Sequence, residues 1–246
     1  MTTKPLHTYI INTEIDYSAL EFNPDDPEPL PDGMFQYPIF SEVFAVLDAH
    51  LNTLGDPETI FRSSNTFICY DRSNLNVRVG PDFYAAFDVD AHAIMHRLIY
   101  LPWEAGKPPD FVLEVASEST GRQDTINKRE IYARIGIREY WRFDSTGGDY
   151  HGEPLAGEAL VNGEYRRIEL TTEPDGVLKG YSPTLRLWLC WQDEMLKFYD
   201  DRTGSYLMNL PDTQAALGNT QAALGEAQSR IRQLEDNLRR AQGENS

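Results

Sequence analysis

The segment at residues 110–116, DFVLEVA, limits the fold more than any other part of this sequence. It is short and almost wholly apolar, and it carries one acid, Glu114, near its middle. Such a run is typical of a central strand that is buried on both faces of a sheet. Burying a carboxylate there is unfavourable unless the group is paired or binds a metal. The segment therefore predicts both a central sheet and a polar site within it.

The segments on either side extend this strand into an α/β pattern. After it, Asp124 can cap a helix that runs to Gly136, and residues 137–143 are the next strand. Strand, helix and strand in this order indicate a βαβ-like or mixed α/β core. Before it, we expect a helix from Ile39 to Leu54 and strands at residues 60–70 and 75–87.

The residues after Asp144 alternate between short strand-like runs and turn-forming residues. Asn162-Gly163 and Thr203-Gly204 are hairpin signals. We interpret this region as an antiparallel addition to the same domain.

The C-terminal segment repeats with a period of seven residues. Leu217, Leu224, Ile231 and Leu238 are seven apart, and a second series follows three residues behind, at Thr220, Ala227, Leu234 and Ala241. This a/d pattern predicts a short coiled coil. A single fraying helix is the alternative, because the early heptads have a threonine at d and glycines at positions 218 and 225.

Acids that interrupt buried strands suggest a metal site. Asp82 follows Pro81 in an apolar strand, and Asp110 opens the strand that contains Glu114. Strand alternation places Asp110 on the same face as Glu114. Two or three converging carboxylates repel one another, and Mg²⁺ or Mn²⁺ would relieve that repulsion through oxygen ligands. Alternatively, each acid is a structural group paired with an arginine such as Arg78 or Arg129.

The helix after the central strand supplies a base to this site. Lys128 and Tyr132 are four residues apart and so share one helix face. If that face turns to the sheet, Lys128 reaches a metal-bound water or a developing phosphate charge. Several arginines, among them Arg122, Arg129, Arg134 and Arg138, lie around this helix. They either face phosphates or pair with the surplus acids.

The charge of the chain argues against a broad nucleic-acid surface. The formal net charge is −17, of which residues 34–212 carry −11, because residues 1–33 carry −6 and residues 213–246 are neutral. Nucleic-acid binders usually present a basic face. Cys69 and Cys190 lie in apolar runs, which predicts buried thiols in a reducing cytoplasm. The sequence has no apolar run of membrane-spanning length.

Six longer strings carry a family resemblance that runs from about Asp32 to Leu210. The chain resembles the Uma family of restriction-endonuclease-like nucleases, within the PD-(D/E)XK superfamily. The strings are SSN (63–65), VGPDFYAAF (79–87), WEAGKPPDFVLEVASEST (103–120), DTINKREIYARIGIREYWRFD (124–144), GEYRRI (163–168) and LKFYDDRTGSYL (196–207).

The resemblance implies roles for several residues. Asp82 matches the PD aspartate, Glu114 matches the acid of the E-x-K signature, and the backbone carbonyl of Val115 is a further metal ligand. Ala116 occupies the usual lysine position, and Lys128 on the next helix matches the displaced base. Tyr132 resembles the helix tyrosine of related sites. An acid on the first helix is also expected after the Asp32-Gly33 pair, and Glu42 is the nearest candidate.

These inferences combine into one expectation with one alternative. We expect a restriction-endonuclease-like mixed sheet flanked by helices over residues 34–210, an extended or disordered lead-in over 1–33, and a heptad tail over 211–246. The expected activity is Mg²⁺-dependent hydrolysis of DNA by a cytoplasmic protein that forms a homo-oligomer, with Asp82, Glu114 and Lys128 as catalytic residues. The alternative is an inactive nuclease-like module that recruits partners or oligomerises through its tail.

Overall fold

The computed structural model describes residues 33–116 and 123–243. Two compact units make up the chain, Met1–Leu207 and Met208–Ser246. Apart from Gly33, the lead-in predicted at residues 1–33 lies outside the described residues, as do Asp32 and Arg122.

The first unit contains a six-stranded sheet, a five-stranded sheet and a small two-stranded sheet. The six-stranded sheet has the order β1-β4-β5-β6-β7-β8, and the five-stranded sheet has the order β13-β12-β11-β10-β9. The strands are β1 (Ile60–Ser64), β2 (Ile68–Cys69), β3 (Arg78–Val79), β4 (Phe83–Phe87), β5 (Phe111–Val115), β6 (Glu139–Phe143), β7 (Leu155–Val161), β8 (Glu164–Arg167), β9 (Leu170–Thr172), β10 (Leu178–Ser182), β11 (Leu187–Gln192), β12 (Met195–Asp200) and β13 (Ser205–Tyr206). The helices are α1 (Gly33–Leu51), a 3-10 turn (Pro57–Thr59), α2 (Ala91–Met95), α3 (Pro102–Ala105), a π-helical turn (Gln123–Lys128), α4 (Arg129–Ile135) and α5 (Leu210–Gly243).

The six-stranded sheet is mixed, as the sequence predicts. β5 runs parallel to β6, with Phe111 opposite Glu139, and the helical segment between them is the crossover connection. The other pairings of this sheet are antiparallel. The mixed α/β class with added antiparallel hairpins is thereby confirmed. The Asn162-Gly163 turn joins β7 to β8 with both residues at positive φ, which is the geometry that a two-residue hairpin requires.

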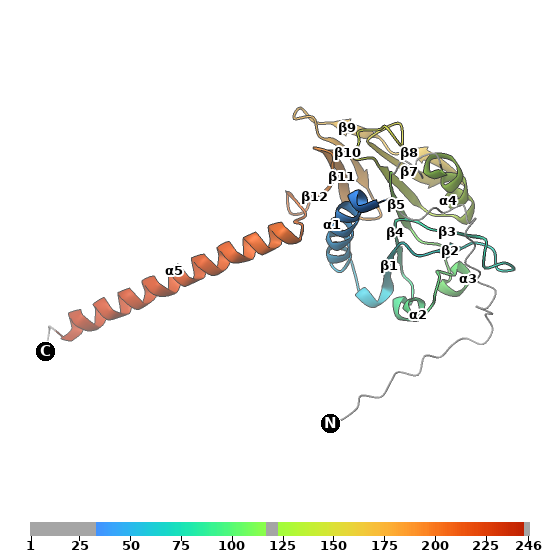
Figure 1. Cartoon of the computed structure of the whole chain (residues 1–246). Helices are drawn as coiled ribbons and strands as arrows, with labels where there is room; N and C mark the ends of the chain where they lie inside the picture. Colours follow the sequence, from blue (N-terminus) through green and yellow to red (C-terminus); the bar gives the residue numbers. More distant parts are fainter. Residues whose placement is uncertain (1–32, 117–122, 244–246) are drawn as a thin grey trace, which may run out of the picture. The chain divides into compact units, whose positions relative to one another are not determined.

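β5 is buried on both faces because two separate apolar layers cover the sheet. Phe111, Leu113 and Val115 pack with α1 and with residues of the second sheet. Val112 packs on the other face, with Tyr132 of α4. Figure 1 shows α1 and α4 on opposite sides of the strands. Alternation along β5 therefore places Glu114 on the α4 side.

The two long strands predicted before β5 are each interrupted. The run at residues 60–70 forms β1 and β2, and Asn65 between them has a φ of 50°. The run at residues 75–87 forms β3 and β4, separated by Gly80, Pro81 and Asp82. The left-handed conformation of Asn65 ends regular pairing because it bends the backbone out of the strand. Pro81 ends it because proline has no backbone N–H to donate. The second interruption places Asp82 directly before the first residue of β4.

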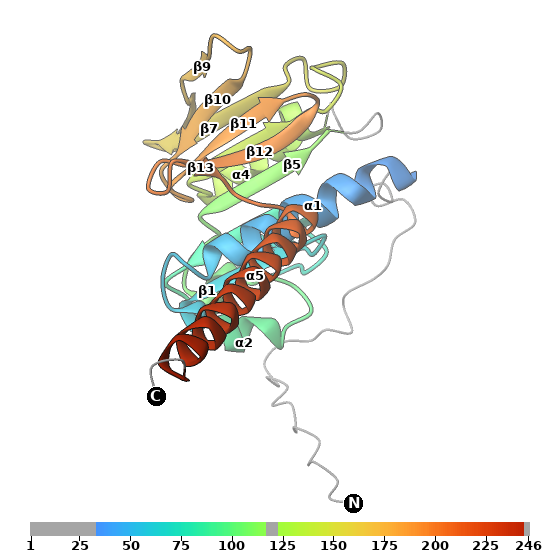
Figure 2. The same cartoon turned by 90° about the vertical axis from the view of Figure 1, so that its left-hand side faces the viewer.

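The five-stranded sheet packs against the six-stranded sheet through Trp141. The Trp141 ring is fully buried and faces Gly157 of β7 and Gly180 of β10. A Cβ atom built on Gly157 would lie 2.7 Å from this ring, and one built on Gly180 would lie 2.8 Å from it. Both glycines are thus required by close approach. Figure 2 shows β9 to β12 as a layer, and α1 contacts β12.

The second unit is formed by α5, a helix of 34 residues. Three apolar residues of the heptad pattern are exposed: Leu217, Leu224 and Ile231. The helix predicted for the tail is present, whereas its coiled-coil partner stays a prediction. Within the described residues, no helix combines the length and the apolar character needed to cross a bilayer.

Candidate functional site

The ends of β4 and β5 bring Asp82 and Glu114 together. Phe83 pairs with Leu113 across the two antiparallel strands, so the residues beyond them, Asp82 and Glu114, lie side by side. The backbone N–H of Asp82 donates to Glu114 Oε2 at 3.3 Å, and that of Val115 donates to Asp82 Oδ2 at 2.7 Å. The two carboxyl groups therefore converge, although they are 32 positions apart in the chain.

The helical connection between β5 and β6 delivers Lys128 and Tyr132 to the same point. Lys128 Nζ lies 3.2 Å from Glu114 Oε2 and donates to the carbonyl of Gly80 at 3.0 Å. The hydroxyl of Tyr132 donates to Glu114 Oε1 at 2.5 Å. Lys128 is the last residue of a π-helical turn, a feature that occurs frequently at functional sites. The structure thus gathers Asp82, Glu114, Lys128 and Tyr132 into one cluster.

Asp124 and His151 also belong to this cluster, although the sequence analysis predicts no role for either in it. Asp124 lies inside the π-helical turn rather than ahead of a helix as its cap. Asp124 Oδ1 lies 3.2 Å from Lys128 Nζ, and Asp124 Oδ2 lies 3.1 Å from His151 Nε2. The one sequence signal for Asp124 is its spacing of four from Lys128. His151 lies in the loop before β7, where no periodic pattern marks it.

Burial and the shared lysine set the protonation of the three carboxyl groups. Burial raises the pKa of Asp82 to about 6, against the charge of Lys128. Burial also raises the pKa of Glu114 well above its ordinary value, and Asp82 adds to this shift by repulsion. Burial would raise the pKa of Asp124 too, but hydrogen bonding from His151 and the charge of Lys128 hold it below its ordinary value. The cluster thus gathers three carboxyl groups around the single lysine Lys128.

Asp110 lies away from this cluster, which corrects the suggestion that it is a metal ligand. It precedes the first residue of β5, four positions before Glu114, and a strand rises about 3.3 Å per residue. Its carboxylate pairs with Lys107 at 2.7 Å and accepts from the Phe87 backbone N–H at 2.9 Å. Strand alternation by itself does not reveal that Asp110 and Glu114 lie at opposite ends of β5.

Glu42 lies on a helix that covers the opposite face of the six-stranded sheet from Lys128. It lies on α1, whose buried residues Val43, Val46 and Leu47 pack on the side of Phe83 and Leu113. Lys128 and Tyr132 reach Glu114 from the α4 side. The structure therefore does not bring the helix of Glu42 onto the face that holds the cluster.

The donor set at the cluster fits a small divalent cation. Within residues 33–116 and 123–243, no group of three or more His, Cys, Asp or Glu side chains is arranged to hold a metal ion. Mg²⁺, however, is usually held by one or two carboxylates with water and substrate oxygens completing its shell. Asp82 and Glu114 provide the two carboxylates. The N–H of Val115 points toward Asp82, and the C=O of the same strand residue points to the same edge.

The arginines around the helix are largely occupied by acids or aromatic rings. Arg129 pairs with Glu158 at 2.8 Å, and Arg138 lies 3.6 Å from Asp110. Arg134 stacks over the ring of Tyr70. Of the two interpretations of this basic group, pairing within the protein is the one that the described residues support.

Comparison with known proteins places the chain in a family. Residues 29–186 match the family model Uma2, described as "Putative restriction endonuclease". The chain belongs to the Uma2 family. No curated protein matches the chain. A solved structure from Anabaena variabilis ATCC 29413, described as a putative nuclease of DUF820, is 15% identical, with a TM-score of 0.44, over 64% of this chain and 76% of that one.

Proposed function

We propose that this Uma2 protein is a Mg²⁺- or Mn²⁺-dependent endonuclease that hydrolyses phosphodiester bonds in DNA. The observation that carries the proposal is the convergence of two buried carboxyl groups, Asp82 and Glu114, on one lysine, Lys128. Burial is the largest cause of their raised pKa values, and a bound divalent cation would oppose it by favouring the charged forms. A divalent ion held by Asp82, Glu114 and the Val115 carbonyl would lower the pKa of a bound water and neutralise phosphate charge.

The residues around Glu114 orient the site. Tyr132 holds Glu114 Oε1, which leaves the other oxygen of this carboxylate for Lys128 and the Asp82 N–H. Lys128 spans Gly80, Glu114 and Asp124, so its ammonium is fixed rather than mobile. In this position it would orient the attacking water or stabilise the negative charge that develops on the phosphate.

The acidic body makes the metal central to substrate binding. With −11 on residues 34–212, the long-range field repels a polyanion. Affinity for DNA should therefore be weak without divalent ions, and it should fall much less steeply with monovalent salt than the affinity of a broad basic surface would. This dependence distinguishes the proposed site from a broad basic surface.

The direct test is cleavage and metal binding by matched variants. Purified protein with Mn²⁺ or Mg²⁺ should cleave single-stranded, double-stranded or branched DNA, and Glu114→Ala should abolish cleavage. Mn²⁺ affinity, measured by calorimetry, should rise with pH through about 6, because protons must leave the carboxyl pair before the ion binds.

The matched control is Glu139→Gln. Glu139 is a buried acid of the neighbouring strand whose carboxylate accepts from the Ser182 hydroxyl at 2.5 Å, outside the cluster. This variant should keep both metal binding and cleavage. If wild-type protein binds no Mn²⁺ and leaves all three kinds of DNA intact, the nuclease proposal is wrong.

A second candidate function is favoured by the exposed apolar stripe of α5. Leu217, Leu224 and Ile231 present a regular surface of the kind that coiled-coil partners cover. A nuclease-like domain without activity could then serve as an interaction module that forms a homo-oligomer. Mn²⁺ binding separates the two candidates, because an interaction module has no need of the Asp82 and Glu114 pair.

A further inference from the structure

We propose that α5 pairs with α5 of a second copy of this chain as a parallel, in-register, two-stranded coiled coil. Leu217, Leu224 and Ile231 at the a positions are 57%, 58% and 56% exposed, and Leu234 at a d position is 61% exposed. Large apolar side chains this exposed, and repeated at a fixed spacing on one helix face, mark an interaction surface. The a/d spacing selects a second helix as its occupant.

The residues of the third heptad favour two strands over three or four. Ile231 occupies its a position and Leu234 its d position, which is the β-branched and leucine combination of parallel dimers. The earlier d positions hold Thr220 and Ala227, both small enough for close approach of two helices. Gly218 and Gly225 fall at b positions on the outside, where a Cβ atom would meet no neighbour.

The flanking charges select the parallel orientation. By sequence, the g positions hold Ala216, Ala223, Arg230 and Asn237, and the e positions hold Gln221, Gln228, Glu235 and Gln242. In a parallel pair, each g residue faces the e residue five positions later on the partner. The g position of Arg230 therefore faces the e position of Glu235 on the other copy, twice by symmetry. An antiparallel pair sets g against g and e against e, which loses both attractions.

The parallel orientation has a consequence for the first unit. α5 starts at Leu210, three residues after Leu207, where the first unit ends. A parallel pair therefore tethers both Asp82–Glu114 clusters to the same end of the coiled coil. An antiparallel pair would tether them to opposite ends of a helix about 50 Å long. Pairing itself does not depend on the proposed nuclease activity, but it would raise the effective concentration of one site beside the other.

Disulfide trapping in the full chain tests the orientation. Cys69 and Cys190 are both buried, so wild-type protein is the control for background cross-linking. Thr220→Cys should form a covalent dimer under mild oxidation, because an in-register parallel pair sets the two d residues opposite each other. Light scattering should give twice the 28.1 kDa mass of the chain. A monomer, a trimer or tetramer, or a dimer that does not cross-link would each overturn the proposal.

A charge swap tests the Arg230–Glu235 pairing with a matched control. Arg230→Glu and Glu235→Arg should each weaken dimerisation about tenfold, and the double variant should return to within about threefold of wild type. Arg232→Glu makes the same charge change at an outward b position and should have little effect. Equal weakening by Arg230→Glu and Arg232→Glu, or no recovery in the double variant, would overturn the assigned contact. Cleavage and metal binding are measured separately, so failure of the nuclease proposal remains distinguishable.

Discussion

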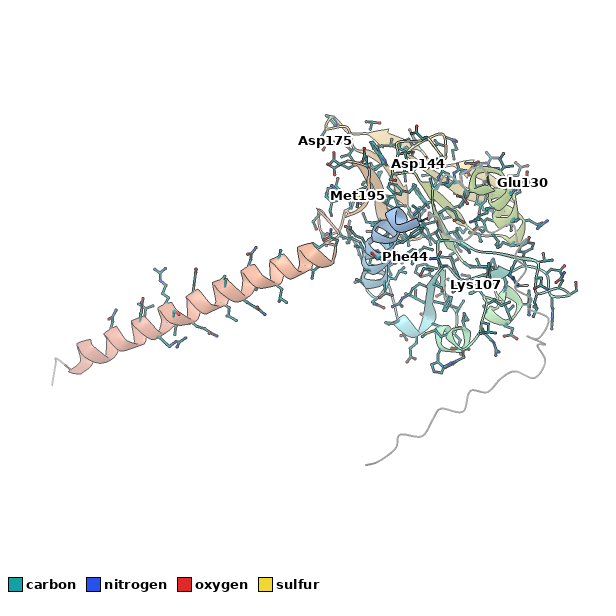
Figure 3. The ribbon with its side chains drawn as sticks, viewed as in Figure 1. Phe44, Lys107, Glu130, Asp144, Asp175 and Met195 are labelled. Carbon is teal, nitrogen blue, oxygen red and sulfur yellow. The ribbon has the colours of Figure 1, made fainter. Side chains whose placement is uncertain are left out.

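The two ends of β5 carry acids of the same kind in different surroundings. Asp110 and Glu114 are both buried and lie four residues apart in or next to one short strand. Asp110 pairs with Lys107 and with a backbone N–H. Glu114 shares Lys128 with Asp124 and lies against Asp82. Lys107 pairs with Asp110 at one end of β5, and Asp144 follows Phe143, which is opposite Val115 at the other end. Figure 3 labels both residues and shows them apart on the first unit.

The difference lies in charge balance. At the Asp110 end Lys107 pairs with a single carboxylate, and Arg138 lies 3.6 Å from the same group, so the cations are not outnumbered. At the Glu114 end one lysine serves three carboxyl groups, and two of these have raised pKa values as a result of burial. Burial and sequence position alone do not distinguish a structural acid from a site acid. The ratio of acids to cations within contact distance does.

Loss of the lysine at each end should give the largest difference. Lys128→Met leaves Glu114 and Asp124 buried without their cation, and should lower the free energy of unfolding by about 3–5 kcal/mol at pH 8. Lys107→Met should lower it by about 1–2 kcal/mol, since Asp110 keeps its backbone hydrogen bond. Chemical denaturation measures both. Equal losses for the two variants would contradict the comparison.

Metal binding should separate the two acids next. Glu114→Gln should weaken Mn²⁺ binding about 100-fold or more, because it removes a charged ligand. Asp110→Asn should change the affinity by less than about threefold, since this carboxylate lies at the other end of β5. Calorimetry at pH 7.5 gives both dissociation constants. A strong effect of Asp110→Asn would return Asp110 to the site and break the comparison.

The pH dependence of stability should follow the raised pKa of Asp82. Its folded-state pKa of about 6 lies above an unfolded value near 3.9, so the folded state binds more protons between about pH 4 and 6. Stability from this group is therefore lost as the pH rises through that window. Asp82→Asn should make the protein more stable by about 1–3 kcal/mol at pH 7.5, and by less at pH 4.5.

Asp200 provides a control of opposite sign for this pH measurement. Hydrogen bonds from Arg202 lower the pKa of Asp200, so its contribution is present at neutral pH and is lost as the pH falls below its unfolded value. Asp200→Asn should therefore destabilise the protein at pH 7.5. Denaturation curves for both variants at the two pH values test the signs. Destabilisation by Asp82→Asn at pH 7.5 would contradict the assigned role of burial.

The smallest effect is expected for Tyr132→Phe. The change removes the hydroxyl that donates to Glu114 Oε1 and should lower the free energy of unfolding by about 1–2 kcal/mol. Tyr165→Phe is the matched control, because its hydroxyl donates to the carbonyl of Ile137 away from the cluster. Mn²⁺ affinity should fall in the first variant and stay unchanged in the second. A fall in both would indicate a general loss of packing.

Local patterns account for the parts that the sequence predicted correctly. Apolar runs and turn residues gave β5, β6 and the helix between them, and the spacing of four placed Lys128 and Tyr132 on one face. They also gave the Asn162-Gly163 hairpin and the long C-terminal helix. Each of these depends on residues that are neighbours in the chain.

The parts that the sequence did not predict lie outside periodic segments, go against local preference, or depend on contacts between distant segments. His151 meets Asp124 across 27 positions, from a loop with no periodicity. The partner of Asp110 is Lys107, three residues earlier, and alternation along a strand does not report on side chains that precede it. The start of α1 at Gly33, with Pro38 inside the helix, also goes against local preference.

The contact of Trp141 with Gly157 and Gly180 makes substitutions at three strands interdependent. A methyl group at either glycine would lie less than 3 Å from the indole. Alanine there would therefore require the ring to move, or a smaller side chain at position 141. Because Trp141 pairs with Leu113, directly before Glu114, any such movement would pass into the strand that carries the carboxylate. Redesign of the interface between the two sheets would therefore have to change Trp141, Gly157 and Gly180 together.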